Sequence, residues 1–238
     1  MHSTFMNCCL WHGSVSAQSV APMIRFHLLG FPIVIHWFFW VNCALLGGAL
    51  DAGSPEKLQV LIGFLIVACA SIVIHELGHA LVMRHFGDRQ VSILLYAFGG
   101  LARGNRWLSR QEDVFVSAAG PFTQLAAAVV MWWVLDAWKP GSPLVYYTLR
   151  SFQEISIFWA LLNLLPIIPL DGGHISRALF GPMRQRASLT LSLACSVGMA
   201  VYAFQYFNTM SVIFFGMFAW NNYKELRGEP QVQWMAGR

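Results

Sequence analysis

One short motif carries the clearest chemical signal in the chain. His75, Glu76 and His79 form an H-E-x-x-H sequence inside a long apolar run. On a helix, two histidines four residues apart are separated by about 40° around the axis and about 6 Å along it, so both imidazoles can bind one metal ion. The glutamate between them stands beside that ion, where a general base is needed. The motif therefore predicts a zinc hydrolase centre, and two interfacial histidines near a helix end are the structural alternative.

A catalytic zinc ion takes three protein ligands and leaves one position open for water. We expect Asp171 to be the third ligand, because of the segment in which it lies. Pro166 and Pro169 interrupt helical bonding before it, and Gly172-Gly173 after it lets backbone approach closely. This pattern predicts the unwound segment that a buried carboxylate ligand requires.

Two other histidines compete for that role. His174 lies three residues after Asp171 and is the nearest alternative. His85 follows His75 by ten residues, which is the spacing of metzincins, but that arrangement needs a chain reversal at a glycine where this chain has Val82. We therefore interpret His85 as an interfacial histidine.

The composition is that of a membrane protein. Of the 238 residues, 57% are hydrophobic and 11% are charged, whereas soluble domains carry about 25% charged residues. The formal net charge is +4, but the basic residues are spread over the loops between apolar runs. We expect the lipid bilayer, and no nucleic acid, as a partner. Five cysteines without metal-type spacing predict neither a disulfide framework nor a thiolate metal site.

Successive apolar runs predict an all-α polytopic membrane protein with about six transmembrane helices. The first three runs easily reach the roughly 20 residues that a span requires. The fourth is long enough but carries Arg150 and Glu154, and the last two are either separate spans or one re-entrant hairpin. The runs cover residues 31–50, 58–83, 114–135, 144–170, 188–207 and 209–220.

The domain organisation that follows is simple. We expect an N-terminal tail over residues 1–24, one membrane domain over 25–223 and a cytoplasmic tail over 224–238. Residues 1–22 contain no Lys or Arg and no long apolar run, so they do not predict a cleavable secretion signal.

The basic residues predict the orientation. With six spans, 12 of the 15 Lys and Arg residues lie in segments on the side of the N-terminus, and three lie on the opposite side. Under the positive-inside rule both termini are then cytoplasmic. The second and fourth runs both descend toward the cytoplasm, which places Asp171 at the same depth as His79.

A metal transporter or channel is the competing functional class, with the four motif residues lining an ion path. Such a path requires polar groups at several depths of the membrane. The other apolar runs offer few besides His36, Asn42 and Gln124. The sequence therefore favours a hydrolase.

Taken together, the H-E-L-G-H of residues 75–79 and the N-L-L-P-x-x-P-L-D-G-G of residues 163–173 resemble the site-2 protease family of intramembrane zinc metalloproteases. Weaker agreement includes the G-F-P-I-V-I-H-W that begins at Gly30, the Phe98-Gly99-Gly100 loop and the S-A-A-G-P that begins at Ser117. The resemblance extends from about Arg25 to Tyr223. It is to a compact member without a PDZ or CBS domain, so we expect no regulation by such a module.

The resemblance implies one Zn²⁺ per chain, held by His75, His79 and Asp171, with Glu76 as the catalytic acid/base. It implies an endopeptidase that hydrolyses a peptide bond in or near the transmembrane segment of a membrane protein, in regulated intramembrane proteolysis. The substrate would be a single-span protein, such as a membrane-tethered transcription factor or anti-sigma factor, after an upstream site-1 protease has acted on it. The location would be the bacterial inner membrane, with the active site open to the cytoplasm.

Two positions in the resemblance have alternative interpretations. Asn163 is similar to the polar residue beside the active centre in this family, which supports the substrate or the oxyanion, but a helix-packing amide explains it equally well. Gln124 departs from the family, which usually has Asn there, and this weakens a catalytic role at that position. The small residues from Ser117 to Gly120 predict close helix packing.

The segment from Val91 to Gly104 predicts strands and a turn directly after the motif helix, because β-branched and aromatic residues precede paired glycines. We expect a small β-hairpin or re-entrant segment there. Its open edge would bind unwound substrate by main-chain hydrogen bonds at Gly99, Gly100 and Leu101. A plain cytoplasmic loop is the alternative.

Overall fold

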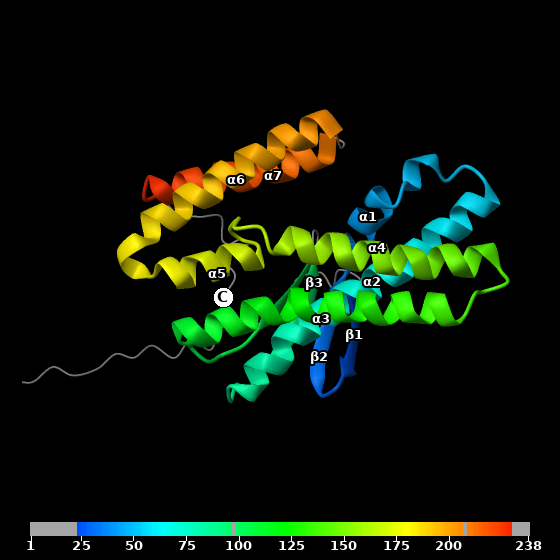
Figure 1. The fold of residues 1–238 in the computed structure, drawn as a ribbon, viewed down its shortest axis with the longest axis horizontal. Coiled ribbons are helices and arrows are strands. Elements are labelled where there is room, and N and C mark those ends of the chain that lie inside the picture. Colours follow the sequence, from blue (N-terminus) through cyan, green and yellow to red (C-terminus); the bar gives the residue numbers. More distant parts are fainter. Residues whose placement is uncertain (1–22, 97–98, 207–208, 230–238) are drawn as a thin grey trace, which may run out of the picture.

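The computed structural model describes residues 23–96, 99–206 and 209–229, so most of the predicted N-terminal tail (1–22 of 1–24) and of the predicted C-terminal tail (230–238 of 224–238) lies outside the described residues (Figure 1). The described part is mostly helical and contains one four-stranded sheet. Its elements are β1 (Met23–Leu28), β2 (Phe31–His36), α1 (Trp37–Leu46), α2 (Pro55–His85), β3 (Ser92–Tyr96), β4 (Gly99–Arg103), α3 (Arg110–Ala137), α4 (Pro143–Asn163), α5 (Asp171–Phe180), α6 (Gln185–Tyr206) and α7 (Thr209–Leu226), with short 3₁₀ turns at Ala49–Asp51 and Pro182–Arg184.

The sheet has the strand order β1-β2-β3-β4. β1 pairs antiparallel with β2, and β3 pairs antiparallel with β4, so the predicted hairpin after the motif helix is confirmed. β2 and β3 are parallel, with Ile33 opposite Ile93 and Ile35 opposite Leu95. The prediction of an all-α fold was wrong in this respect, because two strands near the N-terminus join the hairpin in one sheet.

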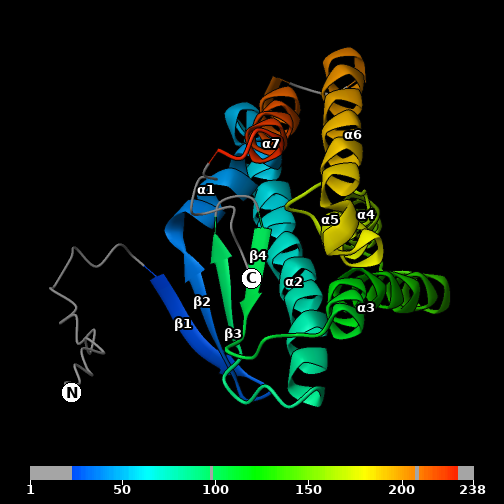
Figure 2. The same cartoon turned by 90° about the vertical axis from the view of Figure 1, so that its left-hand side faces the viewer.

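The first apolar run is not a single helix. Residues Phe31–His36 form β2, and only Trp37–Leu46 are helical. A helix of 10 residues is about 15 Å long, which is too short to cross a bilayer of about 30 Å. No single helix of the length of a span therefore covers residues 31–50, and the β-branched residues Ile33, Val34 and Ile35 explain the strand. Strand and helix together run alongside α2 in the opposite direction (Figure 2).

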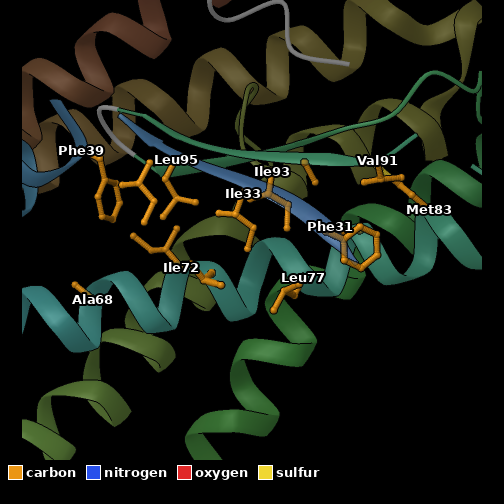
Figure 3. Close-up of a cluster of buried hydrophobic side chains, with 14 of the residues drawn as sticks. Phe31, Ile33, Phe39, Ala68, Ile72, Leu77, Met83, Val91, Ile93 and Leu95 are labelled. Carbon is orange, nitrogen blue, oxygen red and sulfur yellow. The ribbon is translucent and has the colours of Figure 1, made fainter. Parts of the chain in front are cut away.

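One face of the sheet packs on α2 and forms the main core (Figure 3). Side chains alternate along a strand, so Phe31, Ile33 and Ile35 of β2 all point to this face and are buried. Ile93 and Leu95 of β3 join them. Their partners on α2 include Ala68, Ile72, Leu77 and Met83. The sheet therefore fixes the half of α2 that carries the H-E-x-x-H motif.

Within the described ranges, three helical segments are long and apolar enough to cross a membrane: Pro55–His85, Arg110–Ala137 and Pro182–Tyr206. They correspond to α2, α3 and α6 with the turn before it. α4 spans 21 residues and packs on both α2 and α3, while α7 lies along α6 as an antiparallel hairpin (Figure 1). A count of six spans stays a prediction.

Candidate metal centre

His75, His79 and Asp171 meet at one buried point. Both histidines lie on α2, and Asp171 is the first residue of α5. Nε2 of His75 is 3.1 Å from Nε2 of His79 and 3.0 Å from Oδ2 of Asp171, and Nε2 of His79 is 3.4 Å from Oδ1 of Asp171. All three side chains are less than 5% exposed. The fold therefore brings together the three residues predicted as metal ligands, from two elements far apart in sequence.

The second nitrogen of each histidine is held by an acceptor. Nδ1 of His75 lies 3.0 Å from Oε1 of Gln124, and Nδ1 of His79 lies 2.6 Å from the carbonyl oxygen of Val116. A carbonyl oxygen only accepts, so Nδ1 carries the proton in both rings and the Nε2 lone pairs face Asp171. Two lone pairs and a carboxylate directed at one point repel one another unless a cation lies between them. This donor set fits a zinc ion.

Helix α3 forms one wall of the centre, where it carries Gly120. A Cβ atom at Gly120 would collide with the ring of His79 and would lie 2.9 Å from Nε2 of His75. On the other side of the contact, a Cβ at Gly78 would lie 2.6 Å from the carbonyl oxygen of Ala119. Glycine on each helix allows α2 and α3 to approach closely, as the small residues of this region predict.

Glu76 lies beside the three donors, and its side chain contacts β4. The residue is 4% exposed, and its Oε2 atom has no hydrogen-bond partner among the described residues. A Cβ at Gly100 of β4 would collide with the Glu76 side chain, so the strand and the carboxylate are in direct contact. A buried carboxylate oxygen without a hydrogen-bond partner costs free energy, and its place at the metal centre points to a role in chemistry rather than in folding.

The backbone before Asp171 has the unwound form that its prolines predict. Residues 164–170 contain turns and no regular helix between α4 and α5. A Cβ at Gly172 would collide with the carbonyl of Leu164, and one at Gly173 would lie 2.5 Å from the carbonyl of Ile167. The two glycines therefore let the first turn of α5 fold back against the segment that precedes it.

The alternative ligands lie away from this cluster. His85 is exposed at the end of α2. His174 lines a cavity of about 760 Å³ between the end of α2, the loop before α3 and α5, whose lining includes Asp88, Arg103, Arg110 and Arg177. Among the described residues, the one group of three or more side chains with metal-ligand geometry is His75, His79 and Asp171.

The two glycines and Leu101 predicted for substrate binding lie on β4, and Gly100 contacts Glu76 as described above. Asn163 is the last residue of α4, and its Nδ2 donates to the carbonyl oxygen of Trp159 one turn earlier at 2.9 Å. This bond lies within α4 and does not join two helices, so both interpretations of Asn163 stay predictions.

Asp88 forms hydrogen bonds with the loops at the end of α2. Its carboxylate accepts hydrogen bonds from the main-chain N–H groups of Gln90 at 3.0 Å and Arg106 at 2.9 Å. Burial acts to raise the pKa of Asp88, but these donors outweigh it and hold the pKa below its usual range. The ionised carboxylate therefore ties the end of the motif helix to the loop between β4 and α3.

Sequence reasoning missed the place of Gln124 in the site. Its side chain is fully buried and bonds His75, although its departure from the family pattern predicts a weaker role there. One signal was available: Gln124 follows Gly120 by four residues, so both lie on the same face of α3.

Comparison with known proteins agrees with this geometry. Residues 63–144 and 141–204 match the sequence profile of peptidase family M50. The chain belongs to this family. The resemblance to site-2 proteases is confirmed, and curated relatives of the chain are named as zinc metalloproteases. Family membership and the three apolar helices also make the chain an integral membrane protein.

Two curated relatives illustrate the match. A zinc metalloprotease of Methanocaldococcus jannaschii is 29% identical over 157 residues, which are 65% of this chain and 44% of that protein. Stage IV sporulation protein FB of Bacillus subtilis is 34% identical over 152 residues, which are 62% of this chain and 47% of that protein. The chain matches about half the length of these relatives.

A solved structure shows the same fold. The site-2 protease from Methanocaldococcus jannaschii superposes with a TM-score of 0.61, covering 87% of this chain and 96% of that chain at 22% identity. The agreement extends beyond the two motifs to the arrangement of most elements.

Proposed function

We propose that this chain is a zinc-dependent intramembrane endopeptidase that hydrolyses a peptide bond in or near the transmembrane segment of another membrane protein. The observation that carries the proposal is the position of Glu76, a buried carboxylate with one unpartnered oxygen beside three converging metal donors. A carboxylate in this position can act as the general base that hydrolysis requires. Membership of a peptidase family supports the same choice.

Each residue has a distinct role in the proposed reaction. His75, His79 and Asp171 hold the metal through Nε2, Nε2 and a carboxylate oxygen. Zinc, when bound, supplies Lewis-acid chemistry: it polarises the scissile carbonyl and lowers the pKa of a water molecule to about 7. Glu76 takes a proton from the attacking water and later delivers it to the nitrogen of the leaving amine. Because Glu76 holds the proton and does not bind the metal, its loss should stop hydrolysis without emptying the site.

The open edge of β4 provides a place for the substrate. β4 is the last strand in the sheet order, so one side of it is unpaired among the described strands. An extended peptide that pairs with this edge lies next to Gly100, which contacts Glu76. Main-chain pairing tolerates many side chains, and it requires that a substrate helix first unwinds. Gly99, Gly100 and Leu101 are therefore the proposed substrate-binding residues.

The orientation and the biological setting are further parts of the proposal. The distribution of basic residues supports cytoplasmic termini and a centre that opens to the cytoplasm, in a bacterial inner membrane. The substrate would be a single-span, membrane-tethered regulator such as an anti-sigma factor. An upstream site-1 protease would first shorten that substrate.

The test is to compare wild type and Glu76→Gln in zinc content and in cleavage of a single-span reporter protein in liposomes. Glu154→Gln is the matched control, since Glu154 is an exposed acid that pairs with Arg150. We expect about one zinc ion per chain in all three proteins and cleavage by wild type and the control. Substantial cleavage by Glu76→Gln would contradict the mechanism.

A further inference from the structure

The C-terminal hairpin of α6 and α7 contacts the segment that carries Asp171. Residues 164–170 lack regular helical bonding, and Pro166 and Pro169 have no main-chain N–H group to donate. The backbone of this segment lies directly against Gly172 and Gly173. The direction in which Asp171 points therefore depends on how residues 164–170 are held.

Both main-chain polar groups of Ile168 bond to side chains of the hairpin. The N–H of Ile168 donates to Oγ of Ser192 on α6 at 2.7 Å. The carbonyl oxygen of Ile168 accepts from Nδ2 of Asn222 on α7 at 2.9 Å. Oγ of Ser192 in turn donates to Oδ1 of Asn222 at 2.8 Å, so the three residues close a ring of hydrogen bonds.

This ring is buried and its directions are fixed. Ser192 is 0% exposed and Asn222 is 1% exposed. The hydroxyl of Ser192 gives its one proton to Asn222, which leaves a lone pair for the N–H of Ile168. The second proton of the Asn222 amide goes to the carbonyl oxygen of Phe218 at 2.8 Å. A buried polar network with all its groups satisfied rigidifies the backbone that it binds.

Apolar packing and one ion pair support the same contact. Ile167 and Leu170 are buried against the hairpin residues Ala203, Phe215 and Phe218. Further along α5, Nη2 of Arg177 lies 2.6 Å from Oε1 of Glu225 on α7. The hairpin therefore holds both sides of Asp171, the segment before it and the helix that it begins.

We infer that Ser192 and Asn222 are positioning residues for the metal centre. They hold Ile168 in the one backbone position that directs the Asp171 carboxylate at His75 and His79. The inference rests on the proposed role of Asp171 as a metal ligand. It extends the metal site to α7, which begins at Thr209, beyond residue 204 where the family match ends.

The experiment measures zinc affinity in detergent by competition with a chromophoric chelator, for wild type, Ser192→Ala and Asn222→Leu. Ser196→Ala is the matched control, because Ser196 is equally buried on α6 but donates within its own helix, to the carbonyl oxygen of Ser192. We expect zinc affinity to fall roughly tenfold in Ser192→Ala and Asn222→Leu, at the lower end of the loss for a direct hydrogen-bond partner of a metal ligand, because these residues act through the backbone of Ile168. Ser196→Ala should bind zinc like wild type.

Thermal unfolding of the metal-free proteins separates positioning from general stability. If Ser192→Ala and Asn222→Leu lower the metal-free unfolding temperature while zinc affinity stays at the wild-type value, the hydrogen bonds to Ile168 have only a structural role. The inference would then be wrong. An equal loss of zinc affinity in Ser196→Ala would also contradict it. If Asn222→Leu does not fold, the milder Ser192→Ala decides. Absence of zinc binding by wild type would instead contradict the proposed function.

Discussion

The side-chain oxygen of Gln124 lies 3.0 Å from Nδ1 of His75, and this contact determines which nitrogen of His75 faces the metal position. The amide is held in that orientation by α2, because its Nε2 donates to Oγ of Ser71 at 2.8 Å. Oγ of Ser71 is also 2.8 Å from Oγ of Ser156 on α4. A buried polar chain thus connects three helices to one metal ligand.

Replacement of Gln124 by Leu should therefore weaken zinc binding. The variant keeps the size of the side chain but leaves Nδ1 of His75 without its acceptor, so the ring loses its preferred tautomer and orientation. We expect zinc affinity to fall roughly 10- to 100-fold. Gln153→Leu on α4 is the control, since Gln153 is also buried but is not bonded to a metal ligand in the described contacts. Equal affinities in chelator competition would show that Gln124 does not orient His75.

Replacement of Gly120 by Ala should prevent zinc binding, because it adds one methyl group at the metal site. That methyl group would occupy the space beside the rings of His75 and His79. We expect loss of most bound zinc, measured by atomic absorption, with the helical content unchanged. Gly198→Ala on α6 is the control because its Cβ would meet nothing within 4 Å, and it should bind zinc normally and gain up to about 1 kcal/mol in stability. Normal zinc content in Gly120→Ala would place the metal elsewhere.

Asp171→Ala and His174→Ala distinguish the two candidates for the third ligand. Asp171 lies at the histidine pair, whereas His174 lines the neighbouring cavity. We expect Asp171→Ala to lose at least tenfold in zinc affinity, because it removes one of three ligands. His174→Ala should retain the wild-type affinity. The reverse result would transfer the ligand role to His174.

The sequence predicts the metal site better than it predicts the fold around it. H-E-x-x-H spacing and a proline-flanked Asp-Gly-Gly are local patterns. The first places its two histidines on one face of a helix, and the second predicts the unwound backbone before Asp171. Residues 31–50 show the limit: their apolar composition suits a span, but the β-branched Ile33, Val34 and Ile35 pair with β3 instead. That pairing joins residues about 60 positions apart, and no local pattern indicates it.

The polar contacts between helices were also beyond prediction. Gln124, Ser192 and Asn222 each lie in apolar helices, where a buried amide or hydroxyl has many conceivable partners. Their actual partners depend on helix positions that only the fold determines. The strand pair after the motif helix was predictable because its signal, apolar strand residues followed by paired glycines, lies within 14 residues.

Cysteine labelling in intact cells and inverted vesicles tests the orientation. In a background whose five native cysteines are replaced by alanine, Trp107→Cys and Met183→Cys place thiols at positions that are 94% and 95% exposed. A membrane-impermeant maleimide should label both only in inverted vesicles, because the positive-inside rule places these loops in the cytoplasm. Gly53→Cys should label in intact cells. Labelling of Trp107→Cys from outside would overturn the proposed orientation.

Proline substitutions on β4 test how the substrate is held. In an antiparallel pair, the N–H groups of successive residues point alternately toward the partner strand and away from it, so Leu101 and Ala102 direct theirs to opposite sides of β4. Proline removes one N–H group without touching the metal ligands. We expect Leu101→Pro and Ala102→Pro both to retain zinc and membrane insertion and to lose most reporter cleavage. One variant loses an N–H group at the open edge of β4, and the other loses an N–H group that pairs with β3. Hydrogen exchange of the β3 amides identifies which variant leaves the ladder intact. Wild-type cleavage by that variant would exclude the β4 edge from substrate binding.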